Sequence, residues 1–159
     1  PYTFFKNNSA KLLDDISIQL TLAIESEGYK AIPIPSDEPY EYWDAENKHG
    51  RGILSLKHLA QLCGLGSIGK NTLLINKEYG NRLYFGAVIT NAELNEDDLS
   101  NNLCPENCNI CIKSCPQSAL DGITVNQKKC RERCIYATDG GGFVYGCNIC
   151  RKVCPFANI

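Results

Sequence analysis

Cysteine is the residue type in this sequence whose number and spacing could do chemistry. Nine of the ten cysteines lie between Cys104 and Cys154. The first motif reads Cys104-x3-Cys108-x2-Cys111-x3-Cys115-Pro116, and the second reads Cys147-x2-Cys150-x3-Cys154-Pro155. Repetition of C-x2-C-x3-C-P is typical of ferredoxin-type chains, in which the last cysteine of each run binds the cluster of the other run. The spacing therefore predicts two 4Fe–4S clusters.

The second motif lacks a cysteine directly before Cys147, so its missing ligand must lie upstream, at Cys130 or Cys134. We favour Cys130, because it follows residues 123–125, which we predict to be a short strand like the one that delivers the remote cysteine in ferredoxin halves. The glycines at 140–142 give the intervening loop the freedom to bring this ligand in. The first cluster is then assigned to Cys104, Cys108, Cys111 and Cys154. The second cluster is assigned to Cys115, Cys130, Cys147 and Cys150, with Cys134 either spare or the real fourth ligand.

Two other uses of cysteine explain the pattern less well. Structural zinc also uses C-x2-C pairs, but it does not explain why x3-C-P occurs twice. A disulfide framework needs an oxidising compartment, and the chain opens without a secretory signal, so we expect a cytoplasmic protein. Cys63, outside the cysteine-rich part, falls on the apolar face of a predicted helix and is expected to be a small core residue.

The charge differs between the two halves of the chain. Residues 1–103 carry nine basic and 14 acidic side chains, whereas residues 104–159 carry seven basic and four acidic ones. A basic surplus lowers the free-energy cost of holding negatively charged thiolate clusters. The net charge of −2 argues against a general nucleic-acid binder, and no apolar run is long enough to span a membrane.

The first half is predicted to mix helices and strands. One helix is expected to begin at Asn8 or Ser9 and to end at Gly28, with one apolar face made by Leu13, Ile16, Leu20 and Ile24. Residues 31–35 are predicted to be extended, because each proline disfavours helix at the residue before it. Residues 35–52 are predicted to be a long loop.

The rest of this half should contain a second helix and two strands. Ser55 is expected to cap a helix that ends at Gly64. The strands are predicted at 71–76 and 83–90, joined by a turn at Gly80 and Asn81. An acidic linker then covers 93–102. We therefore predict an α+β fold, with a small α/β domain at 1–103 and a ferredoxin-like domain of two clusters at 104–159.

A glycine-rich turn follows the second predicted helix. Its letters, Gly64-Leu-Gly66-Ser-Ile-Gly69, match the dinucleotide fingerprint, and with Lys70 and Asn71 they nearly match a phosphate-binding P-loop. Both motifs need a strand before the glycines and a helix after them. Here the order is reversed, so neither nucleotide site is favoured. The glycines then indicate only that the backbone of this turn comes close to another group. That group is either a ligand or part of a tight connection between helix and strand.

The order of these motifs resembles the epoxyqueuosine reductase family, which is related to reductive dehalogenases. The resemblance rests on residues 58–80, on Gly86–Thr90 and on the double cysteine motif, and it extends over about residues 9–156. It implies that the first half corresponds to part of a cobalamin-binding domain, and that the second half supplies this domain with electrons. The residues that it implies as cofactor contacts are Gly64, Gly66, Gly69, Lys70 and Asn71.

The sequence also departs from that family. The family's proposed acid lies in a Val-Asp-x-x-Pro motif before the glycine turn, whereas residues 49–55 contain neither Asp nor Pro. His49, His58 and Tyr84 are candidate proton donors, and no catalytic residue is assigned. Because the sequence stops just after Pro155, we expect it to lack the helical-repeat extension of the longer enzymes, and a chain without Met is expected to be trimmed or partial.

Together these patterns predict an iron–sulfur redox protein that delivers electrons in a corrinoid-dependent reduction like that of epoxyqueuosine reductases. The expected partners are a ferredoxin-like or flavodoxin-like electron donor, and cobalamin or a corrinoid protein. The alternative is a non-catalytic electron carrier, or a corrinoid-protein activator without its own substrate site.

Overall fold

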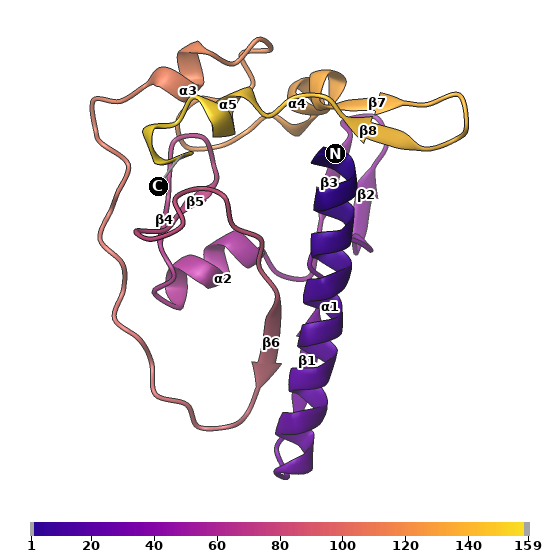
Figure 1. The fold of residues 1–159 in the computed structure, drawn as a ribbon, viewed down its shortest axis with the longest axis vertical. Helices are drawn as coiled ribbons and strands as arrows, with labels where there is room; N and C mark the ends of the chain where they lie inside the picture. The colour runs from indigo at the N-terminus through magenta and orange to yellow at the C-terminus, as the bar shows by residue number, and fades with distance from the viewer. Residues whose placement is uncertain (1, 158–159) are drawn as a thin grey trace.

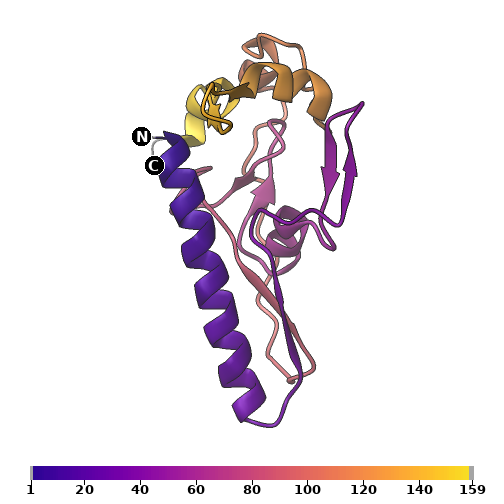
Figure 2. The same ribbon diagram turned by 90° about the vertical axis from the view of Figure 1, so that its right-hand side faces the viewer.

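The computed structural model describes residues 2–157, and its longest element is helix α1 (Tyr2–Ser26). Helix α1 lies along an antiparallel pair formed by β1 (Ala31–Ile34) and β6 (Ala87–Thr90) (Figures 1 and 2). In this pair Ala31 lies opposite Thr90, and Ile34 lies opposite Ala87. The extended segment predicted at 31–35 is thus confirmed, and the mixture of helices and antiparallel pairs is in line with the predicted α+β class. The division at residue 103 stays a prediction.

Helix α1 begins earlier than predicted. Asn8, proposed as a cap, lies inside the helix and donates its side-chain amide to the Phe4 carbonyl at 2.7 Å. No Gly or Pro occurs between residue 2 and the predicted start, so nothing in the sequence prevents the helix from extending towards its N-terminus. The end of the helix before Gly28 is confirmed.

The buried face of α1 also differs from the prediction. Ser17 and Thr21 are buried, whereas Ile16 and Leu20 are about half exposed. A methyl group added at Gly86 would lie 2.7 Å from Ser17 Oγ. Small side chains on this face therefore allow a closer approach than the apolar stripe would have allowed.

The segment predicted as a loop at 35–52 contains a β-hairpin, so that prediction is wrong. Strand β2 (Tyr42–Asp44) pairs with β3 (His49–Arg51). The Asp44 carboxylate accepts hydrogen bonds from the backbone and side-chain amides of Asn47 at 3.0 and 2.8 Å, and these close the turn. The same hydrogen bonds hold the pKa of Asp44 below its ordinary value.

Helix α2 (Leu56–Leu62) follows Ser55, as predicted. The strand that follows the glycine turn is only β5 (Leu74–Ile75), and it pairs with β4 (Ser67–Ile68). The predicted hairpin of 71–76 with 83–90 is therefore wrong, because the second of these segments leaves to pair with β1. Asn76 ends the strand by accepting hydrogen bonds from the backbone amides of Glu78 and Tyr79.

The cysteine-rich half consists of short elements. They are α3 (Ile110–Lys113), α4 (Gln127–Cys134), β7 (Ile135–Ala137), β8 (Phe143–Tyr145), α5 (Ile149–Lys152) and the 3-10 helix η1 (Pro155–Ala157). The strand predicted at 123–125 is a single bridge between Leu120 and Val125. The glycines at 140–142 lie between the paired strands β7 and β8, so they form the turn of a hairpin.

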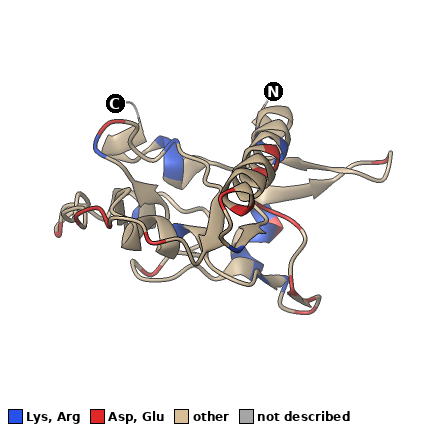
Figure 3. Ribbon diagram, turned by 90° about the horizontal axis from the view of Figure 1, so that it is seen from below, with Lys and Arg blue, Asp and Glu red and all other residues tan. Residues whose placement is uncertain are grey.

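The two halves are joined by hydrogen bonds at several places. The backbone amide of Asn81 donates to Phe156 O at 3.0 Å, and the amide of Tyr145 donates to Thr3 Oγ1 at 2.9 Å. Acidic and basic residues occur on both halves (Figure 3). Among the described helices, none has the length and apolarity needed to cross a membrane. The cytoplasmic location stays a prediction.

Candidate iron–sulfur site

Four cysteines of the first predicted set surround one pocket, which we call the first cysteine pocket. Its thiols are Cys104, Cys108, Cys111 and Cys154, and its narrow cavity measures about 10 Å³. The first three thiols lie on the loop before α3 and within it, and Cys154 follows α5. Burial raises the pKa of Cys111, and the neighbouring thiols of this pocket add to the rise.

The four cysteines of the second predicted set surround another pocket, the second cysteine pocket. Its thiols are Cys115, Cys130, Cys147 and Cys150, around a cavity of about 170 Å³. Burial raises the pKa of Cys150 to about 11, and the other three thiols of the pocket contribute to the rise. The structure thus brings each predicted set of four together around its own cavity, as the crossed order of the motifs requires.

Cys134 does not line either pocket, although it lies next to the second. Its thiol donates to the Cys147 carbonyl at 3.4 Å. A hydrogen bond between the Cys130 and Cys134 thiols raises the pKa of Cys130 and lowers that of Cys134 to about 7. The geometry favours Cys130 over Cys134 as the fourth thiol, and the ligand roles themselves stay predictions.

The donors are eight thiols in two groups of four, and thiolates are the ligands that an iron–sulfur cubane takes. Within residues 2–157, no group of three or more His, Cys, Asp or Glu side chains is arranged to hold one metal ion. All ten cysteines are free thiols. Four thiols spread around a cavity suit the corners of an iron–sulfur cubane, since each thiolate binds a different iron atom.

The glycine turn makes close contacts inside the chain. A methyl group added at Gly64 would lie 2.4 Å from Asp98 O, and one at Gly66 would lie 2.3 Å from Ile75 O. At Gly69 it would meet the Ile75 side chain at 2.7 Å. The predicted acidic linker and strand β5 therefore occupy the space that these glycines leave open.

Lys70 and Asn71 connect the glycine turn to the cysteine pockets. The Lys70 ammonium donates to Glu106 O and, at 3.1 Å, to Asn109 Oδ1, so it holds the loop of the first pocket. Asn71 is 3% exposed and lines both pockets. Its side-chain amide donates to Cys150 O at 3.3 Å, and its oxygen accepts from the Leu73 amide at 3.1 Å. These two residues support the pockets from the side of the first half.

A second support, absent from the sequence predictions, lies beside the second pocket. The Arg131 guanidinium lies 5.5 Å from the Tyr40 ring and 4.9 Å from the Trp43 ring, and these rings are stacked. Gln127 accepts from the Gly50 amide at 3.1 Å and donates to its carbonyl at 3.4 Å. We call these five residues the α4 clamp, because they fasten the β2–β3 hairpin to the helix that carries Cys130.

The candidate proton donors lie outside both cysteine pockets. His58 is exposed on α2, where its Nδ1 is 2.7 Å from Ser55 Oγ. His49 lies half-buried in β3. Tyr84 lines a different pocket, together with Tyr2 and Phe5 of α1. Cys63 is exposed at the C-terminal end of α2, so the prediction of a core position is wrong.

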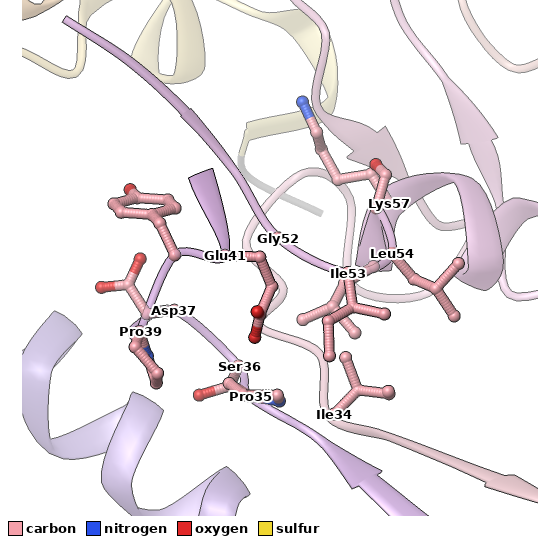
Figure 4. Close-up of a pocket in the computed structure, with 13 residues that line it drawn as sticks. Ile34, Pro35, Ser36, Asp37, Pro39, Glu41, Gly52, Ile53, Leu54 and Lys57 are labelled. Carbon is pink, nitrogen blue, oxygen red and sulfur yellow. The ribbon is translucent and has the colours of Figure 1, made fainter. Parts of the chain in front are cut away.

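A further pocket of about 200 Å³ contains part of the stretch that lacks the family's acid motif (Figure 4). The Glu41 carboxylate points into it, between Ser36 and Ile53, while Lys57 extends away. Lys57 donates to Thr72 O at 2.6 Å, and burial lowers its pKa. Glu41 was not among the site residues predicted from sequence, because nothing in its local spacing marks it.

With this geometry in place, the chain can be compared with known proteins. No family model matches it. It is 38% identical over 118 residues to the epoxyqueuosine reductase of Listeria monocytogenes, which covers 66% of this chain and 30% of that protein. It is 36% identical over 112 residues to the enzyme of Lactococcus garvieae, over 62% of this chain and 30% of that protein. The chain is similar to epoxyqueuosine reductases.

The solved structures agree. The epoxyqueuosine reductase of Streptococcus thermophilus superposes with a TM-score of 0.69 and 28% identity, over 94% of this chain and 40% of that one. The Bacillus subtilis epoxyqueuosine reductase, at 24% identity and a TM-score of 0.62, shares the fold. The predicted resemblance is thereby confirmed, and the chain spans about 30% of the length of the curated relatives named above.

Proposed function

We propose that this chain holds two 4Fe–4S clusters and passes single electrons within a reduction like that of epoxyqueuosine reductases. The observation that carries the proposal is the sorting of eight cysteines into two groups of four around separate cavities. A bound 4Fe–4S cluster supplies one-electron transfer at a potential set by its surroundings.

The chain's own residues do three things in this proposal. The eight thiols, ionised, hold the clusters. Lys70 and Asn71 fix the loops of the two pockets, so that little reorganisation accompanies a change of charge. The Arg131 guanidinium lies beside Cys130 and lowers its pKa, opposing burial and the neighbouring thiol. This cation favours negative charge in the second pocket.

Among the pockets of residues 2–157 named above, none is large enough to enclose cobalamin, which the resemblance implies. The larger pockets found there measure about 170–240 Å³, below the roughly 300–1,000 Å³ that is usual for sites enclosing a small molecule. The glycines proposed as its contacts meet Asp98 and Ile75 instead. Binding of cobalamin is therefore proposed from the resemblance alone.

The names of the relatives support the proposed type of reaction. One solved relative was crystallised with an epoxyqueuosine-modified tRNA stem loop. For this chain we propose an oxidoreductase role, with a ferredoxin-like or flavodoxin-like donor that reduces the clusters. A free-standing carrier is less favoured, because the relatives compared above are named as reductases.

The test is EPR spectroscopy and metal analysis of protein purified without oxygen, before and after dithionite. The proposal expects about eight iron atoms per chain and two interacting reduced-cluster signals. Zinc in place of iron, or iron sufficient for one cluster only, would overturn it. Titration with cobalamin then separates the roles: a base-off cob(II)alamin signal supports a corrinoid-dependent reductase, and a base-on signal supports the carrier.

A further inference from the structure

The turn of residues 121–124 holds an isoleucine out in solvent. Ile123 is 86% exposed. The Asp121 carboxylate closes the turn, because it accepts hydrogen bonds from the backbone amides of Ile123 and Thr124 at 2.8 and 2.6 Å. The Thr124 hydroxyl donates to the same carboxylate at 2.8 Å, and these hydrogen bonds lower the pKa of Asp121. The exposed isoleucine is therefore presented by a preorganised turn.

This turn projects from the wall of the second cysteine pocket. Leu120 and Val125 form a bridge across the base of the turn, and both line that pocket. Pro116 and Arg133 line the same pocket and are exposed, so the pocket reaches the surface of the protein at these residues. The isoleucine thus lies close in the chain to the wall of the pocket in which we propose the second cluster.

Helix α4, which begins two residues after this bridge, presents cations that no other side chain uses. Lys128, Lys129 and Arg133 are exposed, and within residues 2–157 none of them forms a salt bridge or a side-chain hydrogen bond. Residues 121–134 carry four basic and two acidic side chains, and one of these acids, Asp121, is bonded within its own turn. Uncompensated positive charge therefore lies beside the second pocket.

The first cysteine pocket differs in this respect. The one cation in its lining is Lys70, and the Lys70 ammonium already donates to Glu106 O and to Asn109 Oδ1. The cation that lines the second pocket, Arg133, has no such partner within residues 2–157. A negatively charged partner is therefore attracted to the second pocket more than to the first.

We propose that this region docks an acidic protein that donates electrons, and that each electron enters the chain at the second cysteine pocket. We call the region the donor surface; its residues are Pro116, Ile123, Lys128, Lys129 and Arg133. The inference rests on the proposed function, because it requires a cluster in that pocket. One electron passes from the reduced donor to the cluster, and no covalent bond forms or breaks.

The chemistry of the donor surface favours a protein over RNA. An RNA strand would engage the cations, but contacts to phosphates give no role to an exposed isoleucine. An acidic protein uses both features, because protein interfaces combine an apolar centre with a polar rim, and charge on the rim steers the partner.

Two measurements on the intact, cluster-loaded chain test the proposal, with an acidic bacterial flavodoxin as the probe. Stopped-flow mixing with the reduced flavodoxin gives the rate constant of electron transfer, and calorimetric titration with the oxidised flavodoxin gives the binding constant. We expect both to fall as salt is added, because salt screens the attraction between the two proteins. Constants that do not change with salt would overturn the proposal.

Variants locate the donor surface. The double variant Lys128→Glu/Lys129→Glu should lower both constants by about tenfold or more at low salt. The double variant Lys11→Glu/Lys77→Glu makes the same change of charge at exposed lysines elsewhere, and should have a much smaller effect.

The apolar part of the surface has its own pair of variants. Ile123→Ser should weaken flavodoxin binding at every salt concentration, whereas Leu94→Ser, at a leucine that is 75% exposed, should not. Dithionite, a small reductant that needs no docking surface, should reduce all these variants at the rate of the parent.

The outcomes separate this inference from the proposed function. A chain that binds no iron would overturn both. Clusters that dithionite reduces, with flavodoxin constants equally affected in the two double variants, would overturn the donor surface alone. The same holds if Lys128→Glu/Lys129→Glu loses binding of a short RNA stem loop and keeps binding of flavodoxin, because the surface would then be an RNA site.

Discussion

The first cysteine pocket takes three of its four thiols from one short loop, whereas the second gathers its thiols from three separate parts of the chain. The first pocket is narrow, and Lys70 holds its loop by hydrogen bonds to Glu106 and Asn109. The second is wider, contains Cys130 from α4, and relies on the α4 clamp to keep that helix in place. One pocket is thus specified mostly by local spacing, and the other by long-range packing.

This difference has a physical consequence for stability. Loops that bring distant residues together lose more conformational entropy than short ones, so a site built from distant segments depends on supporting contacts elsewhere. Substitutions at such contacts should therefore affect the second pocket more than the first.

The largest expected effect comes from removing a thiol. Cys150→Ala should abolish the second cluster while leaving the first, because Cys150 lines only the second pocket. Iron should fall from about eight to about four atoms per chain. Iron analysis and EPR of reduced protein check this result. Two full clusters in the variant would show that the assignment is wrong.

The next comparison separates Cys130 from Cys134. Cys130→Ser should lose the second cluster, and Cys134→Ser should keep it, because only Cys130 lines the cavity. The two residues lie on the same helix, so each variant serves as the matched control for the other. The reverse outcome in the same iron assay would make Cys134 the ligand.

A smaller effect, common to both pockets, is expected for Asn71→Ala. Asn71 is buried and bonded to Cys150 O and to the Leu73 amide, so its loss leaves two part-buried backbone groups without this partner. We expect a decrease of about 1–3 kcal/mol in the free energy of unfolding. Denaturation with urea measures it, with the exposed Asn101→Ala as control. An unchanged midpoint would exclude a supporting role.

The smallest expected effect is a shift in reduction potential that is confined to the second cluster. Arg131→Gln removes a cation beside Cys130, and should lower the reduction potential of the second cluster by some tens of millivolts, on the order of 1 kcal/mol. Lys70→Met is the matching variant for the first cluster, because it removes the ammonium that donates to Glu106 O in the loop of the first pocket. Potentiometric EPR titration resolves the two signals. Equal shifts in the reduction potentials of both clusters in Arg131→Gln would show that Arg131 does not act on the second pocket alone.

The two pockets also show what sequence can and cannot predict. Seven of the eight thiols followed from spacing, because each motif is a local run whose geometry a cubane constrains. Cys130 was favoured over Cys134 on a predicted strand at 123–125, which is only a single bridge. The α4 clamp did not follow from spacing, since the contacts of Tyr40 and Gly50 with α4 join residues 91 and 77 positions apart and leave no local pattern. The hairpin in residues 35–52 was missed for another reason: its strands are only three residues long, too short for a clear alternating pattern.

The strands show the same limit. The segment at 83–90 has apolar residues typical of a strand, but its partner is β1, far away in sequence, and not the nearby 71–76. The buried face of α1 depends on Ser17 fitting against Gly86, and hydrophobic periodicity cannot signal such a fit. The glycine turn was found from its letters, but its contacts with Asp98 and Ile75 came only from the structure.

The crossed order of the cysteines bears on how the protein is made. Cys154, from the second motif, completes the first cysteine pocket, whose other three thiols come from the first motif. Cys115, from the first motif, belongs to the second cysteine pocket, which Cys147 and Cys150 complete. On the ribosome, the earlier thiols therefore emerge long before either set of four is complete. Under the proposed ligand assignment, insertion of the first cluster must wait until Cys154 has been synthesised, and insertion of the second until Cys150 has been.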